Sequence, residues 1–181
     1  MNTAQVATAG LLGFGYLIAH NVADHWVQSG WEAENKGRKD SIGRAACLSH
    51  VVTYTFTLVA VAGVLILIFH LPVTWHGLVT GLAVSAVTHY WADRRFTLEK
   101  LAQLRGHGDF YKLGQPRDVT AHAVTRMTGE NASTLRLRTY KDTHGEIPWD
   151  NPSLGTGAYV LDQSWHWFWI LVTTIVTVVI P

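Results

Sequence analysis

Apolar residues are gathered into long runs along this chain, and the charged residues lie between the runs. Neither residues 51–71 nor residues 163–181 include any Asp, Glu, Lys or Arg. Uncharged, mainly apolar runs of about 18 residues or more are typical of membrane-spanning helices. The pattern predicts four spans, at about residues 6–26, 46–69, 73–93 and 159–180.

The composition favours a single membrane domain. The chain has 181 residues, of which 48% are hydrophobic and 15% are charged, whereas charged residues make up about 25% of soluble domains. We predict an all-α integral membrane protein, a four-helix bundle formed by residues 1–181 as one domain. A long polar loop, residues 96–157, follows the third span, and we expect a short helix at 118–127 and a short strand at 134–140 within it. Whether this loop is a tether, a small subdomain or a lid over a site is left open.

The basic residues predict the orientation in the membrane. Lys36, Arg38, Lys39 and Arg44 lie between the first and second predicted spans, and the other ten Lys and Arg residues lie between the third and fourth. Loops rich in Lys and Arg stay in the cytoplasm. We therefore expect both charged loops to be cytoplasmic and both termini to be outside, in a bacterial inner membrane.

Three pairs of His and Asp residues, each spaced by four, lie at or near the ends of the predicted spans. The pairs are His20 with Asp24, His89 with Asp93, and Asp162 with His166. A further histidine, His50, lies about one turn into the second span. Residues four apart share a helix face, and the predicted orientation brings all seven side chains to one depth at the cytoplasmic side. We expect them to converge inside the bundle.

This combination of imidazole and carboxylate groups predicts a metal site. Ionisable groups at such a depth face the bundle interior and bind one another or a ligand, and seven groups exceed what mutual hydrogen bonding requires. His and Asp suit zinc, iron or manganese, and helical bundles build dinuclear centres from similar pairs. We predict one or two divalent transition metal ions. The candidate ligands are His20, Asp24, His50, His89, Asp93, Asp162 and His166.

A stripe of small residues runs along the third predicted span. Gly77, Gly81 and Ser85 follow one another at a spacing of four, and the same spacing continues to His89 and Asp93. Small residues allow helices to approach closely in lipid. The face that carries this His–Asp pair is therefore expected to pack against neighbouring helices.

The ordered motifs resemble a family of bacterial and phage membrane proteins described as the domain of unknown function 3307. The shared pattern is His20-x3-Asp24-x3-Gln28, Trp31, Asn35-Lys36, His50, His89-x3-Asp93 and Asp162-Gln163-x2-His166. The resemblance covers all four spans, although the loop from about residue 106 to 157 is longer here than in the family pattern. It implies a membrane fold that carries the His and Asp constellation, and it implies no particular activity.

Metal-dependent hydrolysis at the cytoplasmic boundary of the membrane is the function that we predict. A bound metal lowers the pKa of its water toward neutrality and polarises a phosphoryl or carbonyl oxygen. Asp24 is the candidate for managing protons, and Gln28, one turn beyond it, is the candidate for orienting the substrate. Arg94 and Arg95 either hold a phosphate or anchor the helix end. A phospholipid, a lipid-linked phosphate and a peptide bond all fit as substrates.

Other functions stay open. Transport of protons or divalent metal requires polar side chains along the whole bundle, whereas the pattern gathers them at one end. Haem binding by two histidines leaves the three aspartates unexplained. An interaction protein of a bacterium or phage, which recruits a partner through its cytoplasmic loop, fits the same sequence. The lipid bilayer is the expected partner, a homo-oligomer is left open, and no nucleic acid is expected.

Overall fold

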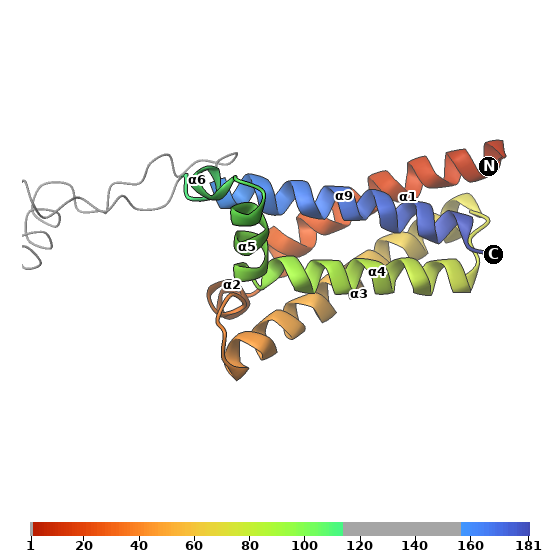
Figure 1. Ribbon diagram of the computed structural model, residues 1–181. Helices are drawn as coiled ribbons and strands as arrows, with labels where there is room; N and C mark the ends of the chain where they lie inside the picture. The colour runs from red at the N-terminus through yellow and green to blue at the C-terminus, as the bar shows by residue number, and fades with distance from the viewer. Residues whose placement is uncertain (1, 114–156) are drawn as a thin grey trace, which may run out of the picture.

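Four long helices form the body of the molecule. Figure 1 shows the computed structural model, which describes residues 2–113 and 157–181. These described residues form helices and no strand, so the predicted all-α class is confirmed. The long helices are α1 (Thr3–Val22), α3 (Ser41–Phe69), α4 (Trp75–Asp93) and α9 (Gly157–Val179). Helix α1 packs on α3 and α9, and α4 packs on the same two helices.

Side-chain caps explain where α3 and α4 begin. The Asp40 carboxylate accepts a hydrogen bond from the Gly43 N–H at 2.9 Å, so α3 starts earlier than the predicted span 46–69. The Thr74 hydroxyl accepts one from the Gly77 N–H at 3.0 Å at the start of α4. Such caps satisfy N–H groups that have no partner in the first turn of a helix. Helix α3 ends at Phe69, and the next residue, His70, adopts the left-handed conformation with φ of 49°.

The first long helix changes its hydrogen bonding near its end. Residues Ala23–Val27 form a π-helix, η1, in which the Gln28 N–H donates to the Ala23 carbonyl oxygen at 2.9 Å. The sequence pattern predicts an ordinary helix that continues through residue 26 and places Gln28 on the face of Asp24. Instead, the helix ends at Val27, and Gln28 has an extended ψ of 128°. Asp24 lies within this π-helix, and such segments are frequent at functional sites.

Three short helices lie at the end of the long helices where η1 ends (Figure 1). They are α2 (Gly30–Asn35), α5 (Phe96–Leu104) and α6 (Gly108–Tyr111). The first part of the predicted polar loop 96–157 is thus helical, because Leu98 and Ala102 of α5 pack with Tyr111 against partly buried aromatic residues of α4 and α9. The predicted helix at 118–127 and strand at 134–140 fall outside the described residues.

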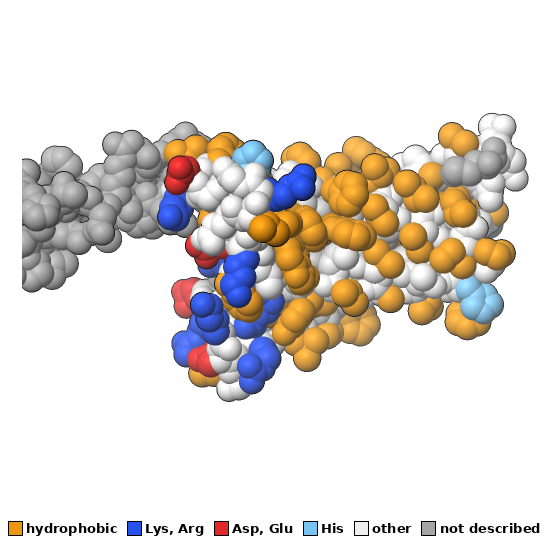
Figure 2. All heavy atoms as spheres, viewed as in Figure 1, with side chains coloured by type: hydrophobic (Ala, Val, Ile, Leu, Met, Phe, Trp, Pro, Cys, Tyr) orange, Lys and Arg blue, Asp and Glu red, His pale blue; other side chains and the backbone are white. Residues whose placement is uncertain are grey.

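The surface of the long helices is apolar, and their interior contains many polar side chains. Phe56 of α3 is 70% exposed, and Phe14, Val87 and Phe168 of the other three long helices are also exposed. Figure 2 shows these helices covered mainly by hydrophobic side chains, with Lys, Arg, Asp and Glu gathered around the short helices. By length and composition, two of the described helical stretches could cross a membrane, Thr3–Val27 and Ser41–Phe69. That any of the four long helices crosses a membrane stays a prediction.

The predicted stripe of small residues on α4 is a site of close helix contact, as expected. A Cβ atom at Gly77 would clash with the Thr177 carbonyl oxygen of α9, and one at Gly81 would clash with the Thr177 hydroxyl. Further along the stripe, the Ser85 hydroxyl forms a 2.7 Å hydrogen bond with the hydroxyl of Tyr54 on α3. The glycines therefore bring α4 against α9, and this packing leads directly to His89 and Asp93.

Candidate metal centre

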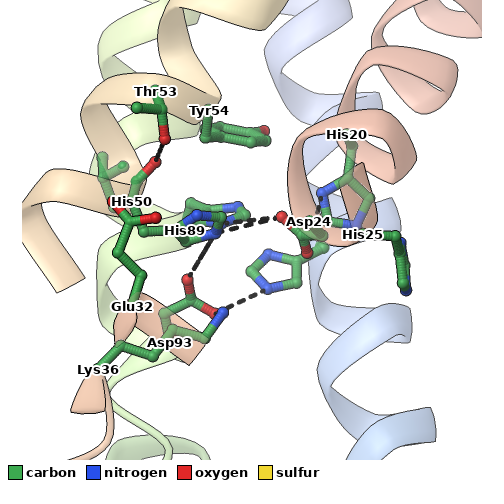
Figure 3. Close-up of polar contacts among 12 residues, drawn as sticks. His20, Asp24, His25, Glu32, Lys36, His50, Thr53, Tyr54, His89 and Asp93 are labelled. Carbon is green, nitrogen blue, oxygen red and sulfur yellow. Dashed lines mark hydrogen bonds and ion pairs between the residues drawn. The ribbon is translucent and has the colours of Figure 1, made fainter. Parts of the chain in front are cut away.

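The seven predicted ligands lie together where the long helices approach the short ones. His20 comes from the last turn of α1, Asp24 from η1, and His50 from α3. His89 and Asp93 come from α4, and Asp162 and His166 from α9. The four histidines and Asp93 are buried, the Asp24 side chain is 8% exposed, and that of Asp162 is 28% exposed. Figure 3 shows how residues from different helices face one another in this cluster.

Four atoms at its centre form a compact group, which we call the quartet: His50 Nε2, His89 Nε2, Asp24 Oδ1 and Asp93 Oδ2. The two nitrogens are 3.0 Å apart. Asp93 Oδ2 is 3.2 Å from each of them. Asp24 Oδ1 is 3.3 Å from the His50 nitrogen and 3.6 Å from the His89 nitrogen.

Five separations within the quartet match the spacing of ligands around one ion, and His50, His89 and Asp93 form one group that could hold it. A tetrahedral ion with N and O ligands at about 2.0–2.2 Å has ligand atoms roughly 3.3–3.6 Å apart. Five of the six separations in the quartet lie between 3.0 and 3.6 Å. Buried His and Asp groups of this cluster therefore have the geometry to hold a metal ion.

The hydrogen bonding of the quartet also favours a cation at its centre. Asp24 Oδ1 and Asp93 Oδ2 are buried and make no hydrogen bond to the described residues. Their nearest polar neighbours are the imidazole nitrogens of the quartet, at 3.2–3.6 Å, and a buried carboxylate oxygen without a hydrogen bond is costly. The two facing imidazole nitrogens share at most one proton when both rings are neutral. A metal ion would satisfy all four atoms at once.

His20 of α1 lies beside the quartet and is paired with Gln163 of α9. His20 Nδ1 is 3.6 Å from Asp24 Oδ2, the oxygen that the quartet does not use. His20 Nε2 is 3.3 Å from the Gln163 amide oxygen, which can accept its proton. With that proton on Nε2, Nδ1 of the neutral ring is an acceptor and makes no hydrogen bond to Asp24. Gln163 is a residue that the site prediction omits, although it belongs to the motif Asp162-Gln163-x2-His166.

A second group of candidate ligands lies on the other side of Asp93. His166 Nε2 is 3.5 Å from Asp162 Oδ1 and 3.8 Å from Asp93 Oδ1. These three residues are also close enough together to hold an ion, as are His20, Asp24 and His89. Asp93 thus faces the quartet with one oxygen and the second group with the other.

Lys36 contacts this second oxygen and is missing from the predicted site. Its Nζ donates to Asp93 Oδ1 at 2.9 Å, and its side chain is only 9% exposed. Lys36 directly follows α2, whose start is fixed by Ser29 and Glu32: each side chain accepts a hydrogen bond from the backbone N–H of the other. Burial alone would raise the pKa of Glu32, but hydrogen bonds from Ser49 and Ser29 hold this pKa below its usual value. The spacing Ser-x-x-Glu is a sequence signal for such a helix start.

A cavity of about 450 Å³ opens onto the site from the charged end of the molecule. Its polar and charged lining consists of Asp24, Gln28, Lys36, Asp93, Arg95 and Asp162, among others. The amide nitrogen of Gln28 is buried and makes no hydrogen bond to the described residues, so a group that enters the cavity can bind it. The site can therefore be reached by a small polar molecule.

Arg94 does not take the phosphate-binding position considered for it. Its side chain donates to the Arg38 carbonyl oxygen and lies over the Phe96 ring, 5.3 Å from the ring centre. The residue is buried and is not part of the cavity lining. Arg95 does line the cavity, and it donates to the Ala33 carbonyl oxygen at 2.9 Å. Of the two arginines, only Arg95 is placed to meet a substrate.

Comparison of the chain with protein-family models, curated proteins and solved structures found no match. The resemblance to the family described as the domain of unknown function 3307 therefore stays a prediction. The candidate site rests on the geometry of its own residues.

Proposed function

We propose that this chain is a metal-dependent membrane hydrolase whose single ion is held by the quartet. The observation that carries the proposal is that His50 Nε2, His89 Nε2 and Asp93 Oδ2 lie 3.0–3.2 Å from one another, with Asp24 Oδ1 3.3 and 3.6 Å from the two nitrogens. Zinc is the ion that we propose, since it combines a tetrahedral preference with His and carboxylate ligands. Iron and manganese suit the same ligand types.

The long helices are proposed to form a four-helix bundle that crosses a bacterial inner membrane. Exposed Phe14, Phe56, Val87 and Phe168 would form a large apolar surface in water, which soluble monomers rarely show. The interior contains buried Thr173, Thr174 and Thr177 instead. Since the charged residues gather around α2 and α5 (Figure 2), we propose that this end faces the cytoplasm, as loops rich in Lys and Arg do.

Hydrolysis needs a position on the metal that water can reach. Structural zinc sites have four protein ligands, whereas catalytic sites keep one position for water or substrate. Asp24 is the quartet member best suited to give up its position, because it has the most exposed side chain of the four and lines the cavity. His50, His89 and Asp93 would then hold the ion. The ion would activate the incoming water, and Asp24 would accept its proton.

Elemental analysis of detergent-purified protein tests the metal site. We expect one zinc ion per chain and its loss in the variant His89→Ala. The matched control is His76→Ala, because His76 lies on the same helix, is exposed and is outside the cluster. Equal metal content in the two variants, or none in the unaltered protein after reconstitution with zinc, would overturn the proposal. Hydrolysis of phosphate and carboxylic esters by the zinc-loaded protein tests the activity itself.

Transport of protons or metal ions is the second candidate, and one observation favours it. The sequence pattern indicates that the polar side chains gather at one end. The structure differs, because the interior of α1 and α9 also contains buried hydroxyl groups away from that end. Among the described residues, those of Tyr16 and Thr173 have no hydrogen-bond partner. Ion flux into liposomes that contain the protein separates this function from hydrolysis, which needs no gradient.

A further inference from the structure

An apolar groove of about 490 Å³ lies beside the polar cavity, on the outer face of α1 and η1. Leu17, Ile18, Val22 and Trp26 line it, and Trp26 is 85% exposed. Tyr159, in the first turn of α9, closes one side of the groove. Exposed tryptophan is typical of the level at which a protein meets lipid headgroups.

The groove and the polar cavity share two lining residues, His25 and Tyr159. His25 Nδ1 is 2.9 Å from the Asn21 carbonyl oxygen, which can only accept, so Nδ1 carries the proton. In the neutral ring Nε2 is then the acceptor, and the Tyr159 hydroxyl donates to it at 3.5 Å. The long, exposed hydrogen bond between Tyr159 and His25 therefore separates the apolar groove from the polar cavity. Figure 3 shows the His25 ring outside the metal cluster.

The charges of the polar cavity complement an anionic group. Lys36 and Arg95 line the cavity together with Asp24 and Asp93 of the quartet. A divalent ion at the quartet would balance Asp24 and Asp93, while Asp162 also lines the cavity. Since Lys36 is paired with Asp93 Oδ1, Arg95 is the cationic side chain that remains to meet a phosphate. Arginine and lysine are the side chains that most often bind phosphate in proteins.

We infer that the substrate is a phosphate-bearing lipid, with its headgroup in the polar cavity and its hydrocarbon chain in the groove between Leu17 and Trp26. This inference rests on the proposed hydrolase function and names the substrate of the same site. The incoming hydroxide forms a bond to phosphorus while the ester P–O bond breaks. Asp24 would pass the proton accepted from the water to the leaving alkoxide, so a lipid phosphate monoester would give inorganic phosphate and a lipid alcohol. The groove lets the chain stay at the bilayer level while the headgroup reaches the metal.

Kinetics with two phosphate monoesters test the inference on the full-length, zinc-loaded protein. One substrate is long-chain phosphatidic acid in detergent micelles, and the other is the water-soluble p-nitrophenyl phosphate. The variant Ile18→Trp fills the groove with a large side chain. We expect it to raise KM for phosphatidic acid about tenfold, roughly the effect of expelling two methylene groups from an apolar site. We expect no change in kcat, and no change in either constant for p-nitrophenyl phosphate.

The matched control is Val6→Trp, which adds the same side chain at another exposed apolar position of α1, outside the groove. Photolabelling with phosphatidic acid that carries a diazirine in its chain gives a readout that does not depend on activity. We expect label on residues 17–26, and competition by unlabelled phosphatidic acid but not by diacylglycerol.

The outcomes separate the two proposals. Hydrolysis of p-nitrophenyl phosphate, with identical KM values for Ile18→Trp and Val6→Trp on phosphatidic acid, would overturn the lipid substrate and leave the hydrolase intact. Groove labelling without hydrolysis of either ester would overturn the hydrolase and support lipid phosphate binding. Labelling that diacylglycerol displaces equally well would show that the phosphate is not recognised, which also contradicts the inference.

Discussion

Lys36 and Asp93 form a buried ion pair at the edge of the His and Asp cluster, with Nζ 2.9 Å from Oδ1. The other oxygen of Asp93 belongs to the quartet, 3.2 Å from both His50 Nε2 and His89 Nε2. Each carboxylate oxygen therefore serves a different partner. The Lys36 ammonium supplies a positive charge where a second metal ion would bridge Asp93 to Asp162 and His166. This ion pair favours one ion over the two that the seven ligands allow.

Replacing Lys36 tests this role. In Lys36→Met the side chain keeps a similar length but loses its charge, so Asp93 Oδ1 becomes free to bind metal with Asp162 and His166, which are close enough to do so. We expect metal content to rise from one to two zinc ions per chain, measured by elemental analysis after dialysis. The control Lys39→Met removes an exposed charge from the same loop and should leave one ion. Two ions in the unaltered protein, or one in Lys36→Met, would contradict this role.

His89 and His166 are expected to differ in their effect on metal affinity, although the sequence places them on equal terms. His89 Nε2 lies within the quartet, while His166 Nε2 is 3.8 Å from the nearest Asp93 oxygen and lies outside it. Loss of a residue that only orients a ligand typically weakens affinity about 10- to 100-fold. We expect His166→Ala to show a loss of that size in competition with a chelating dye. His89→Ala should bind too weakly to compete. Equal loss in both variants would assign His166 a direct role.

The long helices could be predicted from the sequence, and so could the gathering of their His and Asp side chains at one end. Both follow from the spacing of apolar and polar residues along the chain. Long uncharged runs predict α1, α3, α4 and α9, and the spacing of four places His89 and Asp93 on one face. Nothing in that periodicity predicts the π-helix at Ala23–Val27, in which hydrogen bonds skip one more residue. Both the sequence prediction and the structure place Asp24 close to His20. Only the structure shows that Gln28 lies outside the helix.

Lys36 shows what periodicity alone cannot supply. Lys36 precedes α3 in a basic loop. The tendency of Lys and Arg to lie in cytoplasmic loops explains a lysine there, so the sequence gives no reason to assign it to the site. Its contact with Asp93, 57 residues away in sequence, depends on α2, which turns the chain back toward α4. The Ser29–Glu32 capping signal predicts that short helix, but not where it docks. In the same way, Leu98 and Ala102 carry the spacing of an amphipathic helix inside a segment whose overall composition is polar.

The close contact between α4 and α9 predicts opposite effects for two glycine substitutions. At Gly77 an added Cβ would clash with a backbone oxygen of α9, so the helices must move apart. At Gly63 of α3 an added Cβ meets nothing within 4 Å. We expect Gly77→Ala to lower the free energy of unfolding by about 1–3 kcal/mol, as overpacking does. Gly63→Ala should raise it by up to about 1 kcal/mol through helix propensity. Thermal unfolding in detergent measures both, and equal midpoints would contradict the predicted packing.

The proposed orientation predicts where reporter proteins fused to the chain are found. Asp40 lies in the basic segment before α3, and the chain's last residue, Pro181, lies at the opposite end of the long helices (Figure 1). We expect a reporter inserted at Asp40 or at Glu130 to show activity in the cytoplasm, and one fused after Pro181 to show activity outside. A cytoplasmic signal after Pro181 would mean that α9 does not cross the membrane as proposed.

Asp24→Asn separates proton transfer from metal binding. The amide has nearly the same shape as the carboxylate, and His50, His89 and Asp93 remain to hold the ion. Asparagine cannot accept the proton of a metal-bound water, and a well-placed acid–base group typically contributes about 10²- to 10⁴-fold in rate. We expect most of the zinc to be retained while kcat for a phosphate monoester falls by roughly that factor.

The matched control for this prediction is Asp162→Asn, because Asp162 also lines the cavity and contacts a histidine four residues away but lies outside the quartet. It should change kcat far less than Asp24→Asn does. If Asp24 served mainly to hold the ion, Asp24→Asn would lose zinc, and excess zinc would restore its turnover. Metal content and kcat measured on one preparation, with and without added zinc, distinguish these cases. Recovery of activity with added zinc would remove Asp24 from the catalytic step and leave it as a fourth ligand.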